Sequence, residues 1–220
     1  PANALRAGGS RVKRWMGAVP WLLAFLVWVL AAWLRVRGTA TAGVLSDQVG
    51  PWWVAAAGPP WLEPHAPPFG WGLYLPYWLI LSTADSLWTA VQALLLVHAG
   101  VAPLALGAGW LNHRKGCGWV GALVAGMAAA VDPGLIDTAL SGSKAYLAVL
   151  WIGAMTLGLC ARERRWGPLL VLGAWAMAVM NHPLALCALP LLAVLPWRER
   201  RCLWALGLGL VLLLPRLVWV

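Results

Sequence analysis

Short clusters of basic residues alternate with long apolar runs along this chain, and this alternation constrains its fold more than any other feature. Twelve of the sixteen Lys and Arg residues form four clusters: Arg6/Arg11/Lys13/Arg14, Arg114/Lys115, Arg162/Arg164/Arg165 and Arg198/Arg200/Arg201. Five of the seven acids fall between these clusters: Asp47, Glu63, Asp85, Asp132 and Asp137. Lys and Arg beside membrane spans stay on the cytoplasmic side. The pattern therefore predicts basic inner loops and acid-bearing outer loops, so chemistry that needs carboxylates belongs on the outer face.

The composition favours a membrane protein over a soluble one. The chain is 62% hydrophobic and 10% charged, with 18 Trp in 220 residues, and a soluble domain of this size has too much surface to be so apolar. The net charge of +9 forms no continuous stripe of the kind that binds nucleic acid. We interpret it as a determinant of topology and of contact with anionic lipids. The four Cys lie in or beside apolar runs without metal-ligand spacing, which favours buried thiols.

The apolar runs predict an all-α, polytopic transmembrane protein with about seven membrane-crossing segments. Residues 15–34 are twenty apolar residues, enough for a hydrocarbon core of ~30 Å, and they lack a clean cleavage site, so this run is expected to stay as an anchor. Residues 1–14 are then a basic cytoplasmic N-terminus, and residues 15–220 form the transmembrane module, which we expect to continue beyond Val220. The predicted crossings are 15–34, 86–112, 117–131, 139–160, two within 166–197, and 203–220.

The segment 35–85 is predicted to be an outer loop with interfacial helices. Its first part, residues 35–70, interleaves Trp, Gly and Pro with acids, which is typical of short amphipathic pieces in the membrane interface. The aromatic stretch 71–81 is too short to span a bilayer and is expected to be interfacial or re-entrant.

Residues 166–197 connect two basic clusters and must therefore cross the membrane an even number of times. If the turn lies at Asn181-His182-Pro183, each arm has about 15 residues, or ~23 Å at 1.5 Å per residue, which is shorter than a ~30 Å hydrocarbon core. The turn is therefore expected below the outer surface, where polar backbone is tolerated only inside protein or beside a water-filled cavity. Polar residues at such depth favour a functional role for His182.

Several other polar residues on the outer side allow both a functional and a structural interpretation. Asp47, among tryptophans, could act as a base with a raised pKa, although spacing alone favours a solvated loop residue or a helix cap. Arg35, Arg37 and Lys144 depart from the positive-inside pattern. They could hold the phosphate of a lipid-linked substrate, and snorkelling to headgroups explains them equally well.

The remaining candidates have weaker signals. His65 and Glu63 could share a metal, but no third ligand stands at a diagnostic spacing, and a lone His is more often packed or water-bound. Helix capping is the favoured role for Asp85 and Asp137, and Asp132 with Asp137 flanks a Pro-Gly turn. The stretch GALVAGMAAA, within residues 117–131, suits close helix packing.

The order of these features resembles the N-terminal half of the GT-C membrane glycosyltransferases, the superfamily of protein O-mannosyltransferases and aminoarabinose transferases. The likeness rests on an early outer acid (Asp47), the stretch His65-x-Pro67-Pro68-Phe69 before LYLPYWLI, Asp85 at a helix start, Asp132-Pro133 with Asp137, and the hairpin GAWAMAVMNHPLALCALPLLAVL. It covers roughly residues 15–215. It implies that Asp47 deprotonates or orients an acceptor, while a polyprenyl-phosphate sugar donates its glycosyl group.

The resemblance also implies a group that stabilises the leaving phosphate, a role that suits Arg35, Arg37, Lys144 or the surroundings of His182, with His65 as a further binding residue. Many members pair the first-loop acid with a second one, whereas Gln48 follows Asp47 here, a departure that counts against catalysis and against metal binding. A divalent metal stays an open alternative, and no metal ligand is assigned.

We therefore predict a glycosyltransferase-like protein acting on the outer face of a bacterial inner membrane, with membrane lipids and a polyprenyl-phosphate-linked sugar as partners and no nucleic acid. Two alternatives remain open. One is a non-catalytic membrane subunit with a GT-C-derived fold that packs against protein partners. The other is a transporter that uses the Asn181-His182-Pro183 turn as a midplane site.

Overall fold

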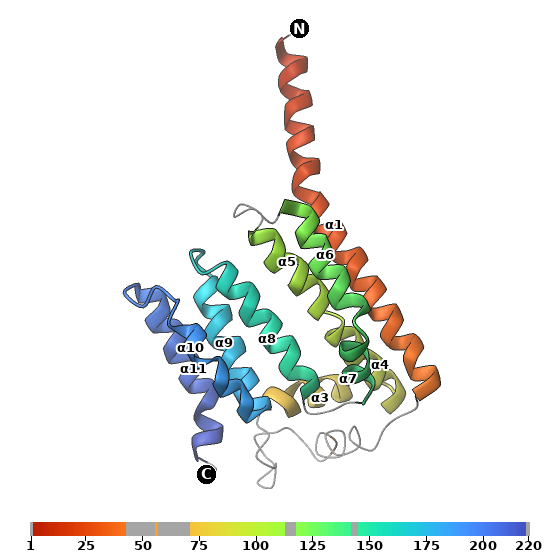
Figure 1. The fold of residues 1–220 in the computed structure, drawn as a ribbon, viewed down its shortest axis with the longest axis vertical. Coiled ribbons are helices and arrows are strands. Elements are labelled where there is room, and N and C mark those ends of the chain that lie inside the picture. Colours follow the sequence, from red (N-terminus) through yellow and green to blue (C-terminus); the bar gives the residue numbers. More distant parts are fainter. Residues whose placement is uncertain (1, 43–55, 57–70, 113–117, 142–144, 219–220) are drawn as a thin grey trace.

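The computed structural model describes residues 2–42, 56, 71–112, 118–141 and 145–218, and these form a helical bundle without β-strands (Figure 1). This confirms the predicted all-α class. The elements are α1 (Ala2–Ala42), α3 (Trp71–Thr83), α4 (Leu87–His98), α5 (Val101–Asn112), α6 (Gly118–Val131), α7 (Pro133–Ser141), α8 (Ala145–Cys160), α9 (Gly167–Asn181), the 3₁₀ helix η2 (Pro183–Ala188), α10 (Leu189–Leu192) and α11 (Arg200–Val218).

Two helices of the described chain are long and apolar enough to cross a membrane. They are Ala18–Gly38 within α1 and Leu87–Asn112, which joins α4 to α5. A third span results if α6 and α7, bent by 42° at Asp132, are counted together. The shorter apolar helices Leu147–Cys160 and Gly167–Asn181 do not reach that length. The structure thus supports a membrane protein, whereas seven crossings and a GT-C arrangement stay a prediction.

Helix α5 packs against both α6 and α8, and helix α9 packs against both α8 and α11. Helix α1 lies along the flank formed by α4, α5, α6 and α7, and its N-terminal part projects beyond the other helices (Figure 1). This helix ends at Ala42 and not near residue 34. Arg35 and Arg37, which the sequence analysis assigned to the outer loop, therefore lie within α1.

The arginine clusters around residues 162–165 and 198–201 lie at one end of the bundle together with Glu163 and Glu199, whereas the described Asp residues lie at the other end. The turn between α8 and α9 and the region at the start of α11 carry six of the arginines, and the hydrogen bond from Arg201 Nη1 to the Glu163 carbonyl (2.9 Å) joins these two regions. At the other end lie α3, α7 and the start of α4 (Figure 1), which bring Asp85, Asp132 and Asp137 to that end. Tertiary packing thus keeps the charge separation that the sequence predicts.

The segment predicted as a hairpin has its turn at the expected residues, but its two arms differ. Helix α9 ends at Asn181, and His182 follows in extended conformation (φ −146°, ψ 127°). The return arm is the 3₁₀ helix η2 and the single turn α10, where Pro183 and Pro190 lack an N–H. Indole N–H groups satisfy two carbonyls of this arm: Trp175 Nε1 donates to Ala185 O (3.2 Å) and Trp197 Nε1 to Leu192 O (2.9 Å). The return arm is therefore not one continuous α-helix, and its crossing of the membrane stays a prediction.

Small residues bring α5 and α6 together, as the stretch GALVAGMAAA predicts. A Cβ at Gly109 would lie 2.7 Å from Ala122 Cα, and one at Gly126 would lie 2.8 Å from Leu106 Cβ. Such distances require the helices to separate if either glycine gains a side chain.

Gly126→Val is therefore expected to lower the stability of the purified protein by about 1–3 kcal/mol, the usual cost of overpacking. The matched control is Gly173→Val on α9, where no atom lies within 4 Å of the new Cβ. Unfolding by SDS or heat in a mild detergent measures both variants. Equal stabilities of the two would contradict close packing of α5 on α6.

Candidate functional site

Three of the residues predicted for the site, Asp47, His65 and Lys144, lie outside the described residues, as does Glu63. The other three, Arg35, Arg37 and His182, are described, and they lie in different surroundings. The structure brings Arg35 together with a residue that the sequence analysis did not select, His98 of α4.

Arg35 and His98 form a fully buried polar contact between α1 and α4. Both side chains are 0% exposed. Arg35 Nε donates to His98 Nδ1 (3.0 Å), and Arg35 Nη1 donates to the carbonyls of Ala31 (3.0 Å) and Ala130 (3.3 Å). The guanidinium thereby ties α1 to α4 and to the C-terminal end of α6. In this arrangement Arg35 binds protein groups, and an anion would have to displace them.

The His98 contact lies beside an interruption of the long helix Leu87–Asn112, and Pro103 explains the interruption. A proline cannot donate to the carbonyl four residues earlier, here Ala99, and its ring crowds that carbonyl. The hydrogen bonds rearrange accordingly: Gly100 N donates to Val97 O (3.0 Å), and Ala102 N donates to Ala99 O (3.2 Å). Only glycine fits at position 100, because a Cβ there would lie 2.8 Å from Val97 O.

This rearrangement takes the Gly100 N–H away from Leu96 O, its partner in a regular helix. The carbonyl of Leu96 instead accepts a hydrogen bond from Trp28 Nε1 of α1 (3.0 Å). A neighbouring helix often satisfies backbone groups that a proline frees within a membrane. Trp28 and Arg35 are seven residues apart, about two helical turns, and therefore lie on one face of α1. That face binds the last turn of α4, directly before the interruption.

Arg37 and His182 have more open surroundings than Arg35. The Arg37 guanidinium is exposed and lies over the Trp33 ring, 5.1 Å from its centroid, in a cation–π contact. His182 is half-buried; its backbone N–H donates to Ala178 O (2.8 Å), and its carbonyl accepts from Ala185 N (3.0 Å). The neighbouring Asn181 is fully buried. The turn thus places a polar amide inside protein, the situation expected for this segment.

Two of the predicted helix caps are displaced in the structure. Ser86 and not Asp85 caps α4, because Ser86 Oγ accepts from Thr89 N (3.1 Å). Asp132 and not Asp137 caps α7, through Oδ1 accepting from Leu135 N (2.7 Å). A cap side chain must precede the first helical turn, and each helix begins at a different residue from the one predicted. Asp85 and Asp137 are exposed.

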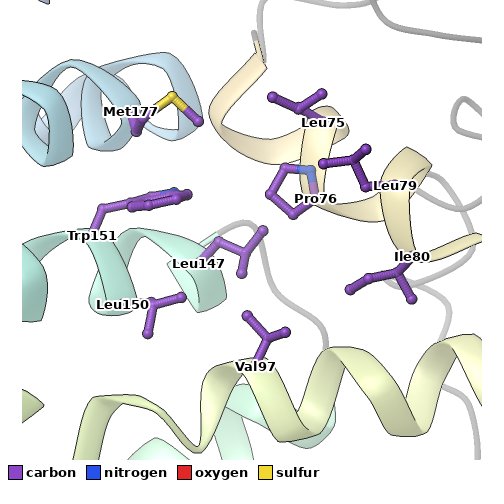
Figure 2. A pocket seen from close by; sticks show the side chains of 9 residues that line it. All are labelled: Leu75, Pro76, Leu79, Ile80, Val97, Leu147, Leu150, Trp151 and Met177. Atoms are coloured by element: carbon purple, nitrogen blue, oxygen red, sulfur yellow. The ribbon is translucent and has the colours of Figure 1, made fainter.

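An apolar cavity of about 310 Å³ lies between α3, α4, α8 and α9 (Figure 2). All nine side chains that line it are hydrophobic. They include Leu75 and Leu79 of α3, Val97 of α4, Leu147 and Leu150 of α8, and Met177 of α9. Tyr77 belongs to α3, which forms one side of the cavity. Burial raises the pKa of its phenol well above the ordinary value, so the hydroxyl stays protonated.

The cavity is partly open and not sealed, because two of the side chains that line it, Leu79 and Val97, are exposed on one side. An apolar cavity excludes water and accepts apolar molecules. At ~30 Å³ per water-sized group, it has room for about ten such groups, or about two isoprene units.

The sequence contained signals for the residues that its analysis missed. His98 is an ionisable residue inside the apolar run 86–112, and such residues mark functional sites by default. Pro103 predicts an interruption at Ala99, four residues earlier. No periodicity connects these positions to Trp28 or Arg35, however. Among the described residues, no three His, Cys, Asp or Glu side chains gather closely enough to hold a metal ion.

Comparison of the chain with protein-family models, with curated protein sequences and with solved structures found no match.

Proposed function

We propose that this protein is a membrane glycosyltransferase-like protein that takes its sugar from a polyprenyl-phosphate donor on the outer face of a bacterial inner membrane. The observation that supports the proposal best is the apolar cavity of about 310 Å³ between α3, α4, α8 and α9. A hydrophobic pocket suits a hydrocarbon chain, and no soluble sugar or nucleotide would find a polar partner on its walls.

The position of the cavity agrees with a lipid donor whose phosphate lies at the acid-bearing end of the bundle. Helix α3 forms one wall at that end (Figure 1), and α8, which forms another, begins at Ala145, immediately after Lys144 in the sequence. Arg37 is exposed near the C-terminal end of α1. Lys144 and Arg37 are therefore the cations that we propose for the phosphate, and Asp47 is the proposed base. His65 and His182 stay candidates for substrate contacts.

The experiment that tests the donor is ligand binding with a cavity-filling variant. Leu150→Trp is expected to weaken binding of undecaprenyl phosphate about tenfold or more, because overpacking an occupied cavity costs about 1–3 kcal/mol. Native mass spectrometry of the detergent-purified protein measures the bound lipid.

The matched control is Ile152→Trp on the same helix, where the side chain points outward and is 42% exposed. This variant should bind like the unmodified protein. Competition with phosphatidylglycerol separates the two hydrocarbon sources. If phosphatidylglycerol displaces the polyprenyl phosphate at equal concentration, or if Leu150→Trp binds normally, the cavity is not a donor site.

A second function, a non-catalytic membrane subunit, has one observation in its favour. Arg35, one of the cations predicted for the phosphate, is fully buried and bonded to His98 and two carbonyls. A subunit that keeps the GT-C fold without the chemistry would retain such a structural contact. Stoichiometric co-purification with a protein partner, together with no bound polyprenyl phosphate, would favour the subunit over the enzyme.

A further inference from the structure

On α4, the residue that lines the apolar cavity lies between two residues that accept hydrogen bonds from α1. Val97 lines the cavity, Leu96 O accepts from Trp28 Nε1, and His98 Nδ1 accepts from Arg35 Nε. The interruption caused by Pro103 lies directly after this segment. The last turn of α4 therefore receives two side-chain hydrogen bonds from α1 at the point where the helical hydrogen-bond pattern is interrupted.

The contacts of α1 with the segment Leu96–His98 come from a single face of the helix. Trp28 and Arg35 lie on one face of the helix, and both bind to the segment Leu96–His98. Around Trp28 the face also carries Val27, Ala31 and Ala32, which are buried against Ala99, Ala102 and Leu106. The alanines in this set allow the two helices to approach closely, so that the hydrogen bonds from Trp28 and Arg35 can form between them.

We infer that α1 is a latch on the apolar cavity: its hydrogen bonds from Trp28 and Arg35 hold the Val97 wall, and their release widens the cavity so that a hydrocarbon chain enters or leaves. This regulates the site of the proposed function and rests on that function for the identity of the chain. Helix α4 is the moving part, with Ala99 and Gly100 at the hinge, because kinks at proline are where long helices bend.

The latch is tested by hydrogen–deuterium exchange of the purified protein in detergent, read on peptides that cover residues 94–104. Trp28→Phe removes the indole N–H and keeps an aromatic ring. Loss of one hydrogen bond should raise the exchange of these amides roughly three- to tenfold. The control is Trp21→Phe on the same helix, where the indole is 78% exposed, and exchange should stay unchanged.

A second variant acts in the opposite direction and does not risk the fold. Pro103→Ala restores a donor for Ala99 O and lets the helix continue, so exchange in the same peptides should fall. Undecaprenyl phosphate serves as the binding probe. Its dissociation should become several-fold faster in Trp28→Phe and slower in Pro103→Ala, with the Trp21→Phe variant as the reference.

The outcomes separate the latch from the proposed function. Unchanged exchange in Trp28→Phe, or a change no larger than in Trp21→Phe, overturns the latch even if the lipid binds normally. Altered exchange with unaltered lipid dissociation overturns the link between the latch and the cavity. If the unmodified protein binds no polyprenyl phosphate, the proposed function fails, and the exchange rates alone decide whether α1 holds α4.

Discussion

Asp47→Asn is expected to reduce glycosyl transfer from a polyprenyl-phosphate donor by about 10²–10⁴-fold, the usual contribution of a positioned general base. Asparagine has nearly the same shape as aspartate, but its amide cannot accept the proton of an acceptor hydroxyl. The change should therefore act on turnover and leave stability and donor binding close to those of the unmodified protein. Sugar transfer in vesicles, measured with a labelled donor, gives the rate.

The chain offers a matched control for this experiment in Asp132→Asn. Asp132 caps α7 through its side-chain oxygen, and asparagine caps helices about as well as aspartate. This variant should keep both its fold and its activity. Transfer by Asp47→Asn at the unmodified rate would mean that Asp47 is not the base, and the subunit function would then become the better explanation.

His98→Leu is expected to destabilise the protein by at least about 3 kcal/mol. The substitution removes the acceptor of Arg35 Nε, and hydrogen bonds to buried charged groups contribute about 1.5–3 kcal/mol, with a further penalty for a charged donor left without that partner. Arg35→Met should cost less, about 1–3 kcal/mol, because it removes the charge and leaves a neutral imidazole. SDS or thermal unfolding in detergent measures these differences.

The double variant Arg35→Met/His98→Leu provides the decisive comparison. Because it replaces both partners by apolar groups, it should be more stable than His98→Leu alone. Strict additivity of the two single effects would show that the hydrogen bond between α1 and α4 contributes no coupling. The double variant would also test whether α1 holds α4 through polar groups or through apolar contact alone.

The fold could be anticipated where local chemistry decides it. The apolar runs predicted helices, and α9 ends at Asn181, where the sequence analysis assumed a turn. The predictions failed where an element depends on its neighbours. The return arm after Pro183 is a 3₁₀ helix and a single turn, and the indole groups of Trp175 and Trp197 accompany it by donating to two of its carbonyls.

The candidate site shows the same division. The outer acids and cations could be selected from their sequence positions, but the role of Arg35 could not. Its hydrogen-bond partners are 63 and 95 residues away along the chain, and the partner of Trp28 is 68 residues away. Hydrophobic periodicity indicates which face of a helix is buried, and it gives no information about which distant polar group that face will meet.

The sequence by itself determined the helical class, the separation of basic from acid-bearing ends and the interruption that Pro103 imposes, because composition, charge and missing N–H groups act locally. Tertiary structure alone decided that α1 covers this interruption, that Arg35 is enclosed with His98, and that four helices leave an apolar cavity beside Val97. These features require groups from distant segments to meet within hydrogen-bond or van der Waals distance, which only the packing of the helices provides.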